Sequence, residues 1–95
     1  MEQLYLYTRA GCHLCAETRS ILDGLLADRA AAGLPSPTVV ERDIDTDADW
    51  LRAFMTTIPV IELAGRRLEL AVGPARIRRL LADALDVPAP TAPRG

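Results

Sequence analysis

The order of β-like and helix-like segments is the feature that most constrains how this chain of 95 residues can fold. Segments of alternating apolar and polar or β-branched side chains indicate strands, and apolar side chains repeated every three or four residues indicate helices. The strands are expected at residues 3–8, 38–44, 59–63 and 67–70. The helices are expected from Cys12 or His13 up to the Gly-Pro break at 33–37, from a cap at Asp45 or Thr46 through Met55, and from Gly73-Pro74 through Leu85.

This order, β-α-β-α-β-β-α, predicts a single α/β domain over residues 1–86. Two β-α-β steps imply parallel strands with right-handed crossovers, and the last two strands are close enough in sequence to form an antiparallel hairpin. The expected architecture is a four-stranded mixed sheet with helices on both faces. Residues 87–95 are rich in proline and are expected to be a disordered tail.

Each helix should bury one apolar face. The expected faces are Leu14, Thr18, Ile21, Leu22 and Leu25 in the first helix, Trp50, Leu51, Phe54 and Met55 in the second, and Ile77, Leu80, Leu81 and Leu85 in the third. Core packing is the simplest role for the two large aromatic side chains in the second helix.

Composition and charge argue against several kinds of partner. The net charge is -2, whereas a nucleic-acid-binding surface is basic. No stretch approaches the ~18 apolar residues of a membrane span, and the first residues carry an acid where a signal peptide carries positive charge. We therefore expect a cytoplasmic protein, a monomer, that binds neither nucleic acid nor membrane. In that compartment thiols are kept reduced, so a cysteine pair is more often catalytic or metal-binding than structural.

Two cysteines lie where the first strand ends and the first helix begins, as Cys12-His13-Leu14-Cys15. Unpaired amides and the positive dipole end of a helix N-terminus stabilise an anion, so Cys12 is expected to ionise more readily. Cys15 lies one turn further into the helix, where it can resolve a mixed disulfide by attacking the Cys12 sulfur. The pattern therefore predicts dithiol redox chemistry with Cys12 as the nucleophile.

Other roles for the cysteine pair are weaker. A structural disulfide closing so short a loop would constrain the unfolded chain by only roughly 2 kcal/mol. A zinc site wants four ligands, and His13 lies between the cysteines at an unusual spacing, so no metal ligands are assigned. Haem attachment needs a histidine directly after the second cysteine, where Ala16 stands.

Two basic side chains are candidates for tuning the thiolate. A charged His13 imidazole would stabilise the Cys12 thiolate and make the disulfide more oxidising, or His13 is simply an ordinary first residue of the helix. Arg9 would supply positive charge to the thiolate or to an anionic substrate, or it is a solvated surface side chain. The residues alone leave both pairs of readings open.

Residues 7–15, Tyr-Thr-Arg-Ala-Gly-Cys-His-Leu-Cys, resemble the active-site segment of glutaredoxins, and residues 57–60, Thr-Ile-Pro-Val, resemble their later Thr-Val-Pro-Val element. The resemblance covers about residues 3–85 and extends to bacterial glutaredoxin-like proteins with a Gly-Cys-His-Leu-Cys site. It implies a thioredoxin-like fold of the glutaredoxin type. Glutaredoxins usually carry Pro-Tyr between their cysteines, where this chain has His13-Leu14.

The resemblance also implies a substrate site. Pro59 would be cis and face the cysteines, the Ile58 backbone would pair with an extended disulfide substrate, and Thr57 would line the same groove. Gly73 matches the family's glutathione-binding turn, although the polar side chain that follows it in the family is absent. No bound cofactor is expected, and glutathione or another low-molecular-weight thiol is a candidate reductant.

The leading hypothesis is a thiol–disulfide oxidoreductase, a dithiol reductase or electron carrier in cell redox homeostasis. Its partners would be disulfide-containing proteins or small molecules, with a thiol or a reductase as electron donor. The alternative is a metal or iron–sulfur cluster module that bridges two chains through Cys12. A scaffold that only binds a partner is least favoured, because it would have no need of two spaced thiols.

Overall fold

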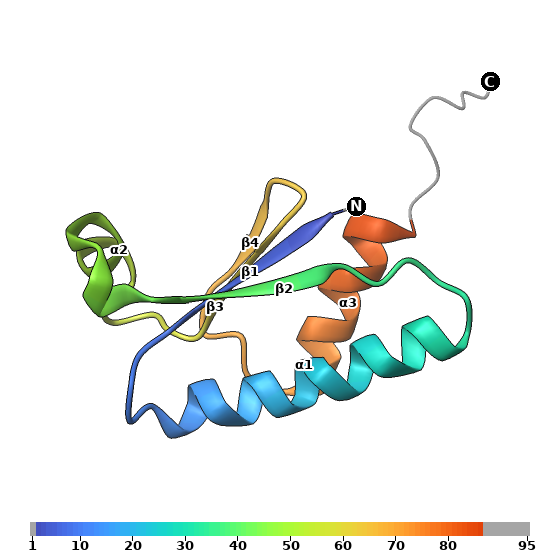
Figure 1. Cartoon of the computed structure of the whole chain (residues 1–95), viewed down its shortest axis with the longest axis horizontal. Helices are drawn as coiled ribbons and strands as arrows, with labels where there is room; N and C mark the ends of the chain where they lie inside the picture. The colour runs from blue at the N-terminus through green and yellow to red at the C-terminus, as the bar shows by residue number, and fades with distance from the viewer. Residues whose placement is uncertain (1, 87–95) are drawn as a thin grey trace.

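The computed structural model describes residues 2–86, so the expected tail at 87–95 lies outside the described residues. The strands are β1 (Gln3–Thr8), β2 (Thr38–Asp43), β3 (Val60–Leu63) and β4 (Arg66–Leu68). The helices are α1 (His13–Ala31), α2 (Ala48–Phe54) and α3 (Pro74–Leu85), with a short 3₁₀ turn η1 (Ile44–Thr46) before α2. The predicted element order is confirmed, with boundaries shifted by a few residues (Figure 1).

The four strands form one mixed sheet in the order β2-β1-β3-β4. β1 pairs parallel with β2 and antiparallel with β3, and β3 and β4 form the predicted antiparallel hairpin. The prediction of two parallel β-α-β steps is therefore right for the first step and wrong for the second. The seven residues of α2 span only about 10 Å, and α2 stays at the end of the sheet where β2 finishes. β3 starts from that same end and must run antiparallel to β1 (Figure 1).

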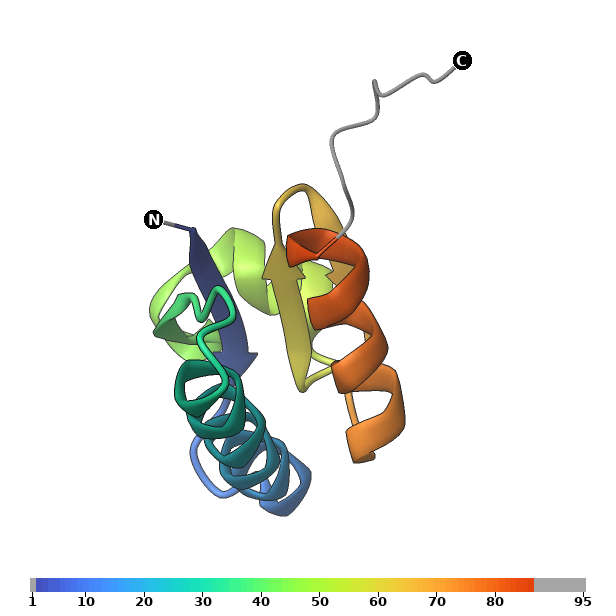
Figure 2. The ribbon, with the colours of Figure 1, turned by 90° about the vertical axis from the view of Figure 1, so that its right-hand side faces the viewer.

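Helices α1 and α3 pack side by side on one face of the sheet, as Figure 2 shows. Alternate residues of β1 and β3 point toward them, since Leu4 lies opposite Leu63 and Leu6 opposite Ile61. All four side chains are at most 1% exposed. The main core is formed by Leu4, Leu6, Leu22, Leu26, Ile61, Leu63, Ala71, Ile77, Leu80 and Leu81.

The opposite face of the sheet carries α2 and a smaller core. Tyr7 lies at its centre, with its ring centroid 4.5 Å from that of Phe54 and 5.7 Å from that of Trp50. Ile44 and Val60 complete the cluster, and both are fully buried. The core role predicted for the two aromatic residues of α2 is confirmed, and helices lie on both faces of the sheet as expected.

Three sequence-based assignments at the ends of helices are wrong. The cap of α2 is Asp47, whose carboxylate accepts from the amides of Asp49 and Trp50 at 2.8 and 3.2 Å, and not Asp45 or Thr46. Burial of Ile44 draws those two residues into η1, so α2 begins later.

Leu14 and Met55 are 47% and 52% exposed and not buried on their helices. At 3.6 residues per turn, Leu14 points about 80° away from Leu22 and about 120° away from Leu26, so it falls at the edge of the buried stripe. Met55 follows the last residue of α2 as its C-cap.

Candidate redox site

The cysteine pair is held by a tight turn between β1 and α1. The Cys12 amide donates to the Arg9 carbonyl at 3.2 Å and closes this turn. Gly11 has a φ of +80°, a conformation that only glycine adopts without strain. Cys12 is then the N-cap of α1, and the Ala16 amide donates to its carbonyl at 3.1 Å. The prediction that the helix starts at this motif is confirmed.

Cys12 and Cys15 form a disulfide, with their Cα atoms 5.2 Å apart. The Cys15 amide donates to the Cys12 sulfur at 3.1 Å, so Cys12 takes the place of the serine, threonine or aspartate that usually caps a helix. Cys15 is only 3% exposed, whereas Cys12 is partly exposed. An incoming sulfur therefore reaches Cys12 first. Negative charge on the Cys12 sulfur is stabilised by the Cys15 amide and by the helix dipole.

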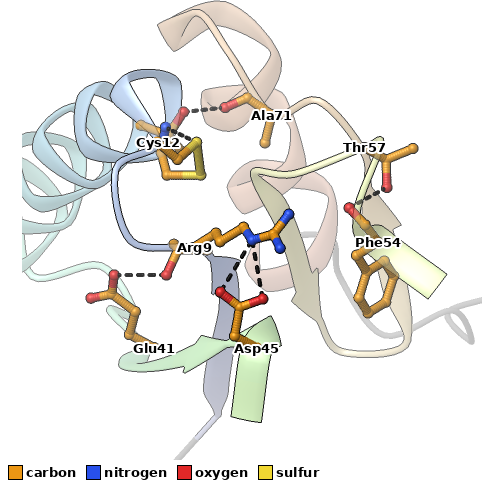
Figure 3. Close-up of a disulfide and its surroundings, with 10 residues drawn as sticks. Arg9, Cys12, Glu41, Asp45, Phe54, Thr57 and Ala71 are labelled. Atoms are coloured by element: carbon orange, nitrogen blue, oxygen red, sulfur yellow. Dashed lines mark hydrogen bonds and ion pairs between the residues drawn. A yellow bond between two sulfur atoms is a disulfide. The ribbon is translucent and has the colours of Figure 1, made fainter. Parts of the chain in front are cut away.

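A shallow hollow opens beside the disulfide. Its lining is Thr8, Arg9, Gly11, Cys12, His13, Cys15, Ala16 and Glu41. The two predicted tuning residues, Arg9 and His13, thus lie next to the disulfide. The Arg9 side chain is bound to Asp45 at 3.1 Å (Figure 3), so much of its charge is offset by that carboxylate.

One carboxylate also borders this hollow. Glu41 on β2 accepts from the Thr8 hydroxyl at 3.1 Å and pairs with Arg19 of α1 at 3.2 Å. These contacts fix Glu41 between the end of β1 and the first turns of α1, and they partly neutralise its charge.

The peptide bond between Ile58 and Pro59 is cis, as the family resemblance implied. A chain of hydrogen bonds ties this loop to the cysteine-bearing helix. The Ala71 amide donates to the Pro59 carbonyl at 2.8 Å, and the buried Thr18 hydroxyl of α1 donates to the Ala71 carbonyl at 2.6 Å. Thr18 lies one turn after Cys15, so the loop is held against the helix close to the disulfide (Figure 3).

The residues before Pro59 are held by the chain itself. The Leu70 amide donates to the Thr57 carbonyl at 2.8 Å, and the Ile58 amide donates to the Phe54 carbonyl at 3.1 Å. The Ile58 amide is therefore already paired within the chain. The substrate roles of Thr57, Ile58 and Pro59 remain predictions.

Gly73 begins α3 as its N-cap, with a φ of +86° and no side-chain capping bond. It follows Ala71 by two residues, which places the start of α3 near the cis-proline loop. Arg76 in the first turn of α3 donates to the carbonyls of Leu70 and Glu69 at 2.8 and 3.1 Å. The binding role of Gly73 also remains a prediction.

Sequence reasoning missed the residues that join the loop to the helix. Thr18 was recognised only as a member of the buried face, although a threonine within an apolar stripe is itself a sign of a buried hydrogen bond. Leu70 was placed at the end of a strand and Ala71 received no role, and no local pattern identifies either as a partner of the loop.

Within residues 2–86 no group of three or more His, Cys, Asp or Glu side chains is gathered as a metal site would require. In the same range, no helix has both the length and the apolar character needed to span a membrane.

Several known proteins are similar to this chain. A structural-genomics target protein from X. campestris shares 28% identity and superposes with a TM-score of 0.67, covering 85% of this chain and 97% of the other. Oxidised mitochondrial thioredoxin 3 from Saccharomyces cerevisiae gives 17% identity and a TM-score of 0.62, covering 86% and 77%. The germline-specific thioredoxin Deadhead from Drosophila melanogaster gives 18% and 0.60, covering 88% and 81%. No curated protein sequence matches the chain.

The two thioredoxins establish that the fold is thioredoxin-like, an α/β fold with a four-stranded mixed sheet and three helices. The model of one protein family matches residues 3–84, which include the disulfide and the cis-proline loop. The chain belongs to the glutaredoxin-like domain family (DUF836).

Proposed function

We propose that this protein is a thiol–disulfide oxidoreductase that reduces disulfides through Cys12 and Cys15. The observation that carries the proposal is the difference between the two sulfurs. Cys12 caps α1, is partly exposed and receives an amide hydrogen bond, whereas Cys15 is buried behind it. Such an arrangement suits attack by the first sulfur and resolution by the second.

The cycle moves two electrons from the protein to its substrate. The Cys12 thiolate attacks one sulfur of the substrate disulfide, that S–S bond breaks, and the released substrate thiolate takes up a proton. The Cys15 thiol then loses its proton, and the resulting thiolate attacks the Cys12 sulfur. The second substrate thiol leaves and the Cys12–Cys15 disulfide is formed. Two equivalents of a low-molecular-weight thiol, or one dithiol, return the pair to the reduced state by the same exchange.

A single-turnover experiment tests the proposal without any added reductant. The reduced protein is mixed with a disulfide substrate, the reaction is quenched by alkylation, and the remaining thiols are counted by mass spectrometry. The wild type should lose both thiols. Cys15→Ser should stop as a covalent adduct with the substrate, and Cys12→Ser should form neither adduct nor internal disulfide.

Reduction of the substrate disulfide by Cys12→Ser at the wild-type rate would refute the assignment. Metal analysis of the same preparation addresses the alternative function. Iron or zinc at about half an equivalent per chain, lost on Cys12→Ser substitution, would support a cluster shared between two chains instead. Regeneration by glutathione, compared with regeneration by a dithiol, tests the candidate reductant.

A further inference from the structure

Four arginine side chains border one hollow between the edge of the sheet and α3. Arg66 and Arg67 come from β4, and Arg76 and Arg79 come from the first turns of α3. Leu68, Leu80 and Asp83 complete the lining, and the volume of the hollow is about 260 Å³. We call it the arginine hollow. None of its lining residues borders the hollow beside the disulfide.

The fold brings these side chains together from two elements. β4 is an edge strand, and α3 runs alongside the β3–β4 hairpin (Figure 2). Arg66 lies opposite Leu63 of β3, which is buried against the helices. Residues directly opposite on neighbouring strands share a face, so Arg66 is on the α3 side of the sheet. Arg76 and Arg79 are three residues apart and share one face of α3.

Most of the positive charge in the arginine hollow is not offset by acids. Of the four arginines, only Arg67 is paired with a carboxylate, that of Glu62 at 2.9 Å. The other three form no ion pair within residues 2–86. Three unpaired arginines against one lining aspartate, Asp83, leave an excess of two positive charges. Like charges held close together repel, and an anion between them removes that repulsion.

One of the unpaired arginines is held in place by the backbone. The two terminal nitrogens of Arg76 donate to the carbonyl oxygens of Leu70 and Glu69 at 2.8 and 3.1 Å. These acceptors are neutral, so they fix the guanidinium without removing its charge. A guanidinium that is already ordered loses less conformational entropy when it binds a ligand.

The chemistry of the lining favours a phosphate ester. Guanidinium groups form paired hydrogen bonds with phosphate oxygens, and a phosphate monoester carries about −1.5 to −2 charge at pH 7. That charge matches the excess in the hollow. Leu68 and Leu80 add an apolar wall on which an organic group can pack. The volume lies just below the range of about 300–1,000 Å³ for drug-sized ligands, so the ligand should be small.

We propose that the arginine hollow binds a small phosphate monoester, with its phosphate held by Arg66, Arg76 and Arg79 and its organic part against Leu68 and Leu80. The proposal does not depend on the dithiol chemistry of Cys12 and Cys15. Inorganic phosphate would meet the same arginines but not the leucines, so affinity separates the two sources of phosphate.

Isothermal titration calorimetry with phenyl phosphate tests the proposal. The titration is made at pH 7.5 and about 0.15 M salt, where charges more than about 8 Å apart are largely screened. Phenyl phosphate should bind with a Kd below about 1 mM. Inorganic phosphate should bind about tenfold more weakly, because it lacks the apolar contact. Benzenesulfonate, which has the same ring and only one charge, should also bind about tenfold more weakly.

Four substitutions of exposed side chains locate the site. Arg66→Gln and Arg79→Gln should each weaken phenyl phosphate binding about tenfold. Asp83→Asn should strengthen it about threefold, because it removes a carboxylate from the lining. Arg78→Gln is the matched control. It removes the same charge from the same helix, but Arg78 borders a different hollow between α1 and α3, so the Kd should change less than about twofold.

Several results would overturn the proposal. A Kd for phenyl phosphate above about 1 mM would do so, as would equal losses in Arg78→Gln and Arg79→Gln, which would mean that net charge alone attracts the anion. Equal affinity for phenyl phosphate and inorganic phosphate would exclude the monoester. Tighter binding of a hexaglutamate peptide would indicate an acidic protein partner instead. Arg66→Gln and Arg79→Gln should oxidise at the wild-type rate in the single-turnover assay, so failure of this proposal leaves the redox function intact.

Discussion

Replacement of Thr18 by valine removes one buried hydrogen bond and little else. The Thr18 hydroxyl donates to the Ala71 carbonyl at 2.6 Å, and both residues are fully buried. Valine has nearly the same shape and a helix propensity close to that of threonine, so no cavity is created and α1 is not weakened by the change itself. The Ala71 carbonyl, however, is left without this donor in the core.

The size of the effect follows from these terms. An unsatisfied buried acceptor costs about 1–3 kcal/mol, and the added methyl group returns about 0.8 kcal/mol through burial. We therefore expect Thr18→Val to lower the free energy of unfolding by about 0.2–2 kcal/mol, with a central value of about 1 kcal/mol. With a urea m-value of about 1.5 kcal/mol/M, the central value lowers the unfolding midpoint by about 0.7 M.

Urea unfolding and native-state hydrogen exchange together check this reasoning. Thr18→Ser is the control, because it keeps the hydroxyl and loses a methyl group at a cost of about 1 kcal/mol. Both variants should lose global stability, but only Thr18→Val should also expose the Ala71 amide to faster local exchange, since the Pro59 loop is no longer tied to α1. An unchanged midpoint for Thr18→Val, or equal Ala71 protection in both variants, would refute the proposed link between helix and loop.

Three further predictions concern stability. Burial raises the pKa of Tyr7 above its ordinary value of 10.0, so the unfolded chain loses this proton first and stability should fall as the pH rises above about 10. Tyr7→Phe should flatten that fall in alkaline urea titrations. Asp47→Ala should cost about 1 kcal/mol by removing the cap of α2, measured by thermal unfolding, and Asp47→Asn should retain most of the stability. The hydrogen bond from Arg29 lowers the pKa of Asp86 below 3.8. The contribution of this ion pair to the free energy of unfolding should therefore be present above that pH and be lost on further acidification. Asp86→Asn should remove this acid-induced loss.

The strongest local patterns predicted most of the fold. Alternation in β1 and the cysteine motif at the start of α1 define the first β-α unit, and the short 64–65 link defines the hairpin. The direction of β3 was mispredicted, because it depends on how far α2 carries the chain. That distance depends on how α2 packs around Tyr7, and no periodicity in the sequence predicts such a contact between distant segments.

At the site, sequence predicted Cys12, Cys15 and the cis bond at Pro59, because each is part of a short motif. The connections between those motifs were not predictable. They run through the backbone of Ala71 and the side chain of Thr18, and a backbone hydrogen bond places almost no demand on residue identity. Only a resemblance to a whole family placed the loop and the cysteines in one site.

The mistaken assignments of Leu14, Met55 and Leu70 carry information of their own. Each follows a pattern that ordinarily leads to burial or to a strand, yet each side chain is about half exposed. Local rules fail most often where a protein accepts a cost for function. Leu70 shows this most clearly, because its φ of +49° lies in the left-handed region that leucine rarely adopts, while its amide is held by the Thr57 carbonyl and its carbonyl by the Val72 amide.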